Sequence, residues 1–183
     1  MLAPLDLLTS NGGALVSSVA ERSLERKMTK KLSLLNHCRK CHAGCCKTGD
    51  LIGSPILSDE ESAKIQDKSC LKEIISPVGE KYWIIAEEGT NRCHFLNDQD
   101  ECELQKNKPL DCLCYPIKAV WKDNEIVYII DTSCPAADYL SNEFINEAKK
   151  IALQSIKRFR KETYDHWLEN YVGWIKSTEK QIK

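Results

Sequence analysis

The 183-residue sequence has little of what targeting and charge-driven binding require. Acidic and basic residues nearly cancel, at 27 against 26, so no strong overall charge attracts a nucleic acid or a membrane surface. The apolar runs are too short to cross a bilayer. Residues 1–8 have no basic region and contain an early acid, which is not the pattern of a signal peptide. We therefore expect a cytoplasmic protein with no membrane or nucleic-acid partner, and another protein is the partner class that stays open.

Common catalytic signatures are also missing from the sequence. No Gly-rich loop for a nucleotide or for S-adenosylmethionine is present, and Gly12 and Gly13 alone do not make one. No convincing Ser/His/Asp set is found, and we expect the isolated His94 and His166 to be structural. The sequence leaves open whether the protein is an enzyme.

Cysteine, by contrast, is abundant, with ten residues, four of them inside the nine-residue stretch Cys38-Arg-Lys-Cys41-His-Ala-Gly-Cys45-Cys46. The chain is long enough to bury a core without cross-links. Thiols stay reduced in the cytosol, so this density favours metal binding over a disulfide framework. Two residues between the first pair let both sulfurs turn toward one ion. The adjacent Cys45 and Cys46 need not ligate the same ion.

Further cysteines in the second half of the chain allow a site that is built from both halves. Such a site would fasten the N-terminal loop to the later hairpin region, and its binding free energy would act as folding free energy. These later cysteines are Cys93, Cys102, Cys112, Cys114 and Cys134.

The order of the cysteines resembles that of a known family. Cys38-x2-Cys41-x3-Cys45-Cys46 is followed by Cys93-x-Phe-Leu and by Cys102-x-Leu-x3-Lys-Pro-x2-Cys112-x2-Tyr115-Pro116. This pattern is similar to the YkgJ-type cysteine-cluster family, described as zinc- or iron-chelating domains, and to the cluster of flagellin lysine N-methylases. The similarity runs from about Cys38 to Cys134, and the helix start at 57–61 also fits it. The flanking helices lie outside it.

The resemblance implies eight ligands, which suit two four-coordinate sites, or one [4Fe–4S] cluster and a second site. Zinc and iron both accept four thiolates, and the spacing matches neither ferredoxins nor radical-SAM enzymes, so spacing does not decide the metal. The likeness to the methylases favours iron–sulfur. The implied ligands are Cys38, Cys41, Cys45, Cys46, Cys93, Cys102, Cys112 and Cys134. Of the remaining two, Cys70 is expected to be a small buried hydrophobe, and Cys114 is equally a ligand or a bystander.

Two positions that hold arginine in the family hold other residues in this chain. Lys108 stands before Pro109, and Leu113 follows Cys112. Since lysine lacks the planar fork of arginine, any anion-holding role of those arginines is in doubt.

His42 replaces the glycine of the family and creates a match to the c-type haem motif, Cys38-x2-Cys41-His42. Covalent haem would need export, for which no signal is seen. Met28 is the only methionine besides the initiator, so a methionine axial ligand is scarcely available. Haem is therefore disfavoured, and His37 and His42 are expected to lie at the surface or beside the ligands more than to replace them.

The patterns predict an α+β fold, with a small metal-stapled core of short strands, hairpins and loops flanked by N- and C-terminal helices. A helix is expected to end near residue 35, and a capping box from Ser58 to Glu61 begins a short helix to about 68. A strand at 81–86 is expected to turn back through 93–96, and a second hairpin to join 117–121 to 125–130.

From residue 141 the chain is expected to be helical to its end, with an apolar stripe that packs into the core. The predicted stripe is Phe144, Ala148, Ile151, Ala152, Ile156 and Phe159, continued by Trp167, Leu168, Tyr171, Val172, Trp174 and Ile175. The expected organisation is one globular unit with an N-terminal helical extension at 1–36, a metal-binding core at 37–140 and C-terminal helices at 141–183.

Three functions remain open at this point. The first is a cytoplasmic metal-binding protein that holds an iron–sulfur cluster, zinc, or both. The second is a cluster-dependent enzyme that resembles protein N-methyltransferases. The third is a zinc-built structural interaction module, although no recognised nucleic-acid motif accompanies it.

Overall fold

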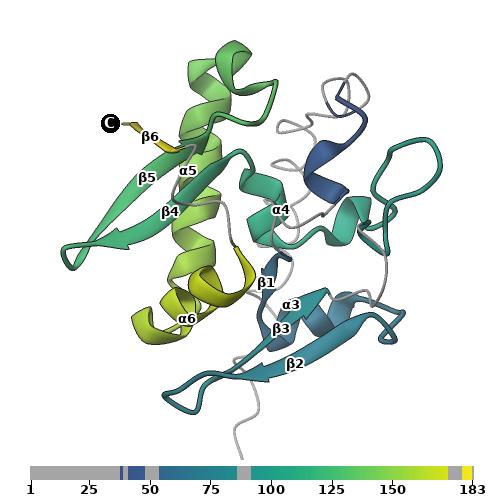
Figure 1. Ribbon diagram of the computed structural model, residues 1–183, viewed down its shortest axis with the longest axis vertical. Helices are drawn as coiled ribbons and strands as arrows, with labels where there is room; N and C mark the ends of the chain where they lie inside the picture. The colour runs from purple at the N-terminus through teal and green to yellow at the C-terminus, as the bar shows by residue number, and fades with distance from the viewer. Residues whose placement is uncertain (1–37, 39–40, 48–53, 86–91, 173–178, 183) are drawn as a thin grey trace, which may run out of the picture.

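The computed structural model describes residues 38, 41–47, 54–85, 92–172 and 179–182, with both helices and strands (Figure 1). The described part contains two three-stranded antiparallel sheets and the helices around them. The expected α+β class is therefore confirmed. The helix that was predicted to end near residue 35 lies outside the described ranges.

The first sheet contains β1 (Ile56–Leu57), β2 (Leu71–Ile75) and β3 (Lys81–Ile85) in the order β1-β3-β2. Helix α3 (Asp59–Lys64) follows β1 directly. The predicted capping box is present, because the Ser58 hydroxyl accepts from the Glu61 amide while the Glu61 carboxylate accepts from the Ser58 amide at 3.0 Å. This reciprocal pair satisfies amides that the first turn of a helix leaves without partners.

The prediction that 93–96 pairs with the strand at 81–86 is wrong. The partners of β3 are β1 and β2, and residues 93–96 form a turn in which the Leu96 amide donates to the Cys93 carbonyl at 3.0 Å. The missed signal was the turn between β2 and β3, where Gly79 adopts a φ of 77°. A glycine with positive φ between two apolar runs is a hairpin signal.

The second sheet contains β4 (Ile117–Lys122), β5 (Glu125–Asp131) and β6 (Glu179–Ile182) in that order. The predicted hairpin is confirmed, and its two-residue turn, Asp123 and Asn124, has positive φ at both positions, as a right-twisted hairpin favours. The last segment was expected to be helical, and that prediction is wrong. It adds a strand to β5, whose unpaired edge offers the hydrogen-bonding groups for it.

Helix α4 (Leu110–Cys114) precedes β4, and the long helix α5 (Asn142–Ile156) packs against both of them. The short 3₁₀ turns are η1 (Gly44–Cys46), η2 (Gln105–Asn107) and η3 (Ala137–Tyr139). The predicted stripe from Phe144 to Phe159 is buried throughout. In the described part of the chain, no helix combines the length and apolar character needed to cross a bilayer.

Helix α6 (Lys161–Tyr171) connects the two sheets through buried aromatic side chains. The Tyr164 hydroxyl donates to the Ala119 carbonyl of β4 at 3.1 Å, and the Trp167 indole donates to the Ser54 carbonyl before β1 at 2.9 Å. Both rings belong to one hydrophobic core that also contains Tyr82 of β3. The two sheets thus share a core.

Trp167 in this core and Trp121, which packs against it, give a matched pair for a stability test. Trp167 is fully buried and its N–H is paired, whereas the buried N–H of Trp121 has no hydrogen-bond partner within the described residues. We expect Trp167→Phe to cost at least about 1 kcal/mol more than Trp121→Phe, because only the first leaves a carbonyl without its donor. Denaturant unfolding of both variants measures the difference, and equal costs would contradict it.

Candidate metal centre

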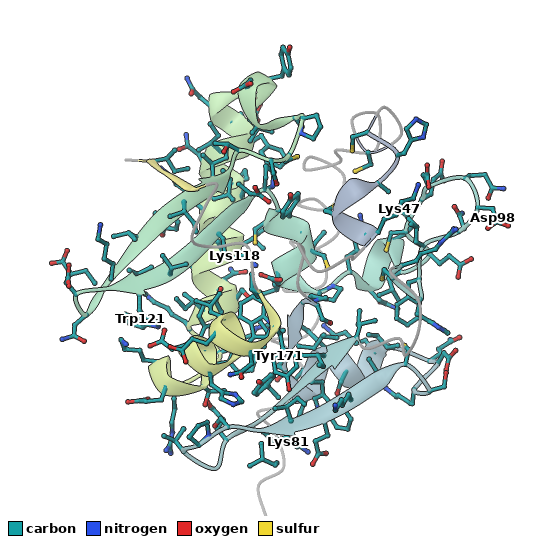
Figure 2. All side chains as sticks on the ribbon, in the orientation of Figure 1. Lys47, Lys81, Asp98, Lys118, Trp121 and Tyr171 are labelled. Carbon is teal, nitrogen blue, oxygen red and sulfur yellow. The ribbon has the colours of Figure 1, made fainter. Side chains whose placement is uncertain are left out.

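The predicted ligands come from four separate segments of the chain, and all ten cysteines are thiols and not disulfides. Figure 2 shows sulfur atoms in yellow around η1, near α4 and in the loop that contains η2. These elements lie together on one side of the molecule in Figure 1.

A backbone hydrogen bond joins the first cysteine segment to the second half of the chain. The Cys93 amide donates to the Cys46 carbonyl at 2.6 Å. Asp100 adds an ion pair with Lys47 at 2.8 Å and accepts a hydrogen bond from His42 at 3.3 Å. His42 is exposed, so the structure gives it the surface position that was expected.

The loop from 93 to 102 is compact and brings its two cysteines close together. Leu96 and Cys102 form an isolated β-bridge, and the Glu103 amide donates to the Phe95 carbonyl at 2.7 Å. Cys93 and Cys102 are partly buried against the smaller hydrophobic cluster around Phe95. Their backbone is therefore held by hydrogen bonds, and their side chains by packing.

Helix α4 carries Cys112, and two carboxylates anchor it to the rest of the fold. Glu61 accepts from the Leu110 amide at 2.8 Å, and Asp111 forms a buried ion pair with Lys118 at 3.1 Å. Burial raises the pKa of Asp111, and the Lys118 ammonium opposes that rise. Asp111 is buried, whereas the next residue of the helix, Cys112, is exposed.

The two cysteines that the pattern leaves over lie in the core. Cys70 is 4% exposed and Cys114 is 1% exposed, and the Cys114 thiol donates to the Asp111 carbonyl at 3.4 Å. The expectation that Cys70 is a buried hydrophobe is confirmed. Burial is the main cause that raises the pKa of Cys114.

Four thiols lie close enough that a charge on any one of them affects the others. Burial, the largest cause, raises the pKa of Cys93 to about 12, and negative charge on Cys46 and Cys102 acts in the same direction. Although Cys112 is exposed, burial is the largest cause that raises the pKa of its thiol well above the ordinary value, followed by the charge of Asp111. Every pair within this set interacts in this way; the set is Cys46, Cys93, Cys102 and Cys112.

A second set of thiols adjoins the first. Burial raises the pKa of Cys38 to about 11; Lys108 opposes that rise, and charges on Cys41, on Cys46 of the first set and on Cys134 add to it. Cys134 is affected by Cys41 in turn, so these three thiols also interact in every pair. Cys45 interacts with Cys38, and its sulfur is 4.0 Å from that of Cys46.

Lys108 lies among these thiols and was not predicted as a site residue. Burial, the largest influence, would lower the pKa of its ammonium, but the surrounding thiols outweigh burial and the pKa is raised. The thiols responsible are Cys102, Cys112, Cys38 and Cys46. The available signal was its position, which holds an arginine in the similar family.

Tyr115 and Asp131 form a second feature that spacing did not reveal. The Tyr115 hydroxyl donates to the Asp131 carboxylate at 2.6 Å, and Asp131 is fully buried. Burial and then Asp131 raise the pKa of Tyr115, and smaller effects come from Cys45 and Cys134. This pair therefore lies beside the second set of thiols.

The thiols lie in one region, but their side chains are not arranged as ligands of a single ion. Among the residues whose positions are described, no three His, Cys, Asp or Glu side chains lie close enough together to hold a metal. The eight predicted cysteines thus share one region at distances over which their charges interact.

Comparison with known protein families, curated proteins and solved structures finds no match to this chain. A proposal of function must therefore be based on the thiols and their surroundings.

In the reduced, metal-free protein, Cys46 should be more reactive than Cys38 near neutral pH. The Cys45 thiol, as hydrogen-bond donor, and then Lys108 lower the pKa of Cys46 to about 7, whereas that of Cys38 is about 11. Because the thiolate is the nucleophile, alkylation of Cys46 should level off just above neutral pH. Alkylation of Cys38 should keep rising toward pH 11.

Peptide mapping after brief iodoacetamide treatment measures both rates in one sample. Cys38 and Cys46 are similarly exposed, so access does not explain a difference between them. Cys45→Ala should slow alkylation of Cys46 at neutral pH, because the hydrogen-bond donor is lost. Equal rates for Cys38 and Cys46 at about pH 7 would contradict the assignment.

Proposed function

We propose that this is a metal-binding protein whose eight predicted cysteines hold an iron–sulfur cluster, zinc, or both, as the resemblance to the YkgJ-type cysteine-cluster family implies. The main support is the gathering of thiols from four distant segments into one region. Residues 38 and 134 lie almost a hundred positions apart in sequence, and their thiols interact.

The division of the ten cysteines supports the same proposal. The two that lie outside the family pattern, Cys70 and Cys114, are the two that are fully buried in hydrophobic surroundings. The other eight are partly or fully accessible. Thiols that serve packing and thiols that are available to a ligand are thus separated in the fold.

Thiolate ligands suit both zinc and an iron–sulfur cluster. Zinc takes four thiolates in closed sites, and a [4Fe–4S] cluster is also held by four. When bound, zinc supplies a fixed tetrahedral link, and an iron–sulfur cluster supplies redox chemistry. The chain's own residues supply the thiolates and the charge around them.

Metal binding would also explain how loops with little regular structure keep their shape. Most of these cysteines lie in loops, in turns and in η1, and burial raises the pKa of several thiols. A cation that replaces their protons stabilises the buried thiolates, and the binding free energy then contributes to folding. For structural zinc in small domains, that contribution is about 10–16 kcal/mol. The metal-stapled core is part of this proposal.

Lys108 suits a centre with excess negative charge. Four thiolates around a divalent metal carry a net negative charge, and burying such a charge is unfavourable without a compensating group. The thiols that raise the pKa of Lys108 are those that would become thiolates on metal binding.

Purification without oxygen tests the proposal directly. We expect metal to copurify with the folded protein, either as iron with acid-labile sulfide and broad visible absorption, or as zinc in a colourless protein. Elemental analysis and the visible spectrum measure both. A folded protein that contains no metal, takes up neither zinc nor iron, and melts at the same temperature with a chelator would refute the proposal.

A pair of variants in α4 separates metal loss from lost packing. Cys112→Ala should lose bound metal and lower the melting temperature, because one ligand is missing. Cys114→Ala, two residues along the same helix, should keep its metal and lose only packing free energy of about 1 kcal/mol. If both variants kept the same metal content as the natural chain, Cys112 would not be a ligand.

Removal of the Lys108 charge should weaken metal binding without removing a ligand. We expect Lys108→Met to lower zinc affinity about tenfold or more, and Lys108→Arg to stay near the natural value. Chelator competition measures the affinity. Lys122→Met is the control, because Lys122 is exposed at the end of β4. Equal affinities in the Met variants would show that Lys108 does not act on the site.

A further inference from the structure

We infer that the eight thiols form two separate four-thiolate sites, so that the adjacent Cys45 and Cys46 bind different metals. The first site contains Cys46, Cys93, Cys102 and Cys112, and the second contains Cys38, Cys41, Cys45 and Cys134. This inference rests on the proposed function, and it adds which thiols act together.

The first site combines three local structures, and each carries a thiol that interacts with that of Cys46. The hydrogen bond from the Cys93 amide to the Cys46 carbonyl brings these residues together. The β-bridge between Leu96 and Cys102 closes the loop that carries the next two thiols. Cys112 is presented by α4, and its thiol interacts with each of the other three. The set is complete, since no pair in it lacks an interaction.

The second site begins with a tight turn at the start of the cysteine segment. The Ala43 amide donates to the Cys38 carbonyl at 2.8 Å, and the Cys41 thiol lies 3.5 Å from the same carbonyl. These contacts place Cys41 and Cys38 beside each other. Cys134 interacts with both of their thiols, although it comes from the segment after β5.

Cys45 lies at the border between the two sets. Its sulfur is 4.0 Å from that of Cys46, and it interacts with Cys112 of the first set and with Cys38 of the second, so its thiol neighbours alone do not assign it. We place it in the second site because its neighbour Tyr115 also interacts with Cys134. The first set is already complete with four thiols, the number that a closed site requires.

Tyr115 and Asp131 position Cys134 for the second site. Asp131 accepts the Tyr115 hydroxyl on one carboxylate oxygen, and on the other it accepts the amide and hydroxyl of Ser133, next to Cys134. The Asp131 carbonyl also accepts from the Cys134 amide at 3.3 Å. The turn that carries Cys134 is thereby fastened to the end of α4.

Pairs of serine substitutions test the division. Reduced, metal-free protein is titrated with cobalt(II) under anaerobic conditions, and bound metal is counted by thiolate absorption and elemental analysis. The natural chain should bind two equivalents. Same-site doubles, Cys46→Ser with Cys102→Ser and Cys45→Ser with Cys134→Ser, should each keep one equivalent. The cross-site double, Cys46→Ser with Cys134→Ser, should keep none.

Other outcomes of the titration overturn the inference or the function separately. If single variants at Cys45 and Cys46 each lose both metals, one shared centre replaces the two sites. If a cross-site double keeps as much metal as the same-site doubles, the assignment of the thiols is wrong. If the natural chain binds neither cobalt(II) nor iron, the proposed function fails before the division is tested.

Cadmium-113 NMR of the natural chain gives an answer even where a variant does not fold. Two tetrathiolate resonances without cadmium–cadmium coupling are expected. A single resonance, or coupling between two, would show one site or a thiolate shared by both metals, and either result overturns the division.

A tyrosine variant tests the positioning of Cys134 while all eight thiols are kept. Tyr115→Phe should weaken cobalt(II) binding about tenfold or more at one site and leave the other unchanged. Tyr128→Phe is the matched control, because Tyr128 is only partly buried on β5 and its ring contacts Lys149. Equal weakening at both sites, or none, would remove Tyr115 from this role.

Discussion

The buried carboxylate of Glu61 joins three segments of this structure through hydrogen bonds and an ion pair. One oxygen accepts from the amide of Leu110, at the start of α4, and the other caps α3 and pairs with Arg158 at 3.1 Å. Three segments distant in sequence therefore meet at one buried side chain, which is 7% exposed. A buried carboxylate is stable only when such partners surround it.

The position of α4 follows from this anchor, and much of the candidate metal centre follows from α4. Asp111 faces the core and pairs with Lys118, which also lies 4.5 Å from the ring centre of Trp167. The next residue, Cys112, is exposed, and its thiol interacts with those of Cys46, Cys93 and Cys102. Tyr115, just after the helix, reaches Asp131 beside the second set of thiols. The five-residue helix α4 thus links the hydrophobic core to the loops that carry the other cysteines.

The cysteine region depends on forces of a different kind. Its segments are joined by a few backbone hydrogen bonds, such as that between Cys93 and Cys46, and by the ion pair of Lys47 with Asp100. Exposed ion pairs contribute little to stability. Thiols that are crowded together and partly buried gain most from a cation that binds several of them at once. This is the physical basis on which we propose a metal centre, with Lys108 as its nearest compensating charge.

Local sequence was sufficient for features that depend on neighbouring residues. The capping box at Ser58, the hairpin turn at Asp123 and Asn124, and the buried stripe of α5 were all predicted from short patterns, because their interactions span only a few positions. The resemblance of the ordered cysteines to a known family likewise implied which eight thiols to consider. Their role as ligands remains a prediction.

Contacts between distant segments were decided only by the tertiary structure. Strand β3 pairs with β2 and not with 93–96, and β6 completes the second sheet, because strand pairing depends on which edges the rest of the fold leaves open. The burial of Cys114, the place of Lys108 among the thiols and the bond between Tyr115 and Asp131 arise in the same way. Each depends on groups that come together when two sheets pack on one core. The spacing of residues along the chain does not predict such contacts between distant segments.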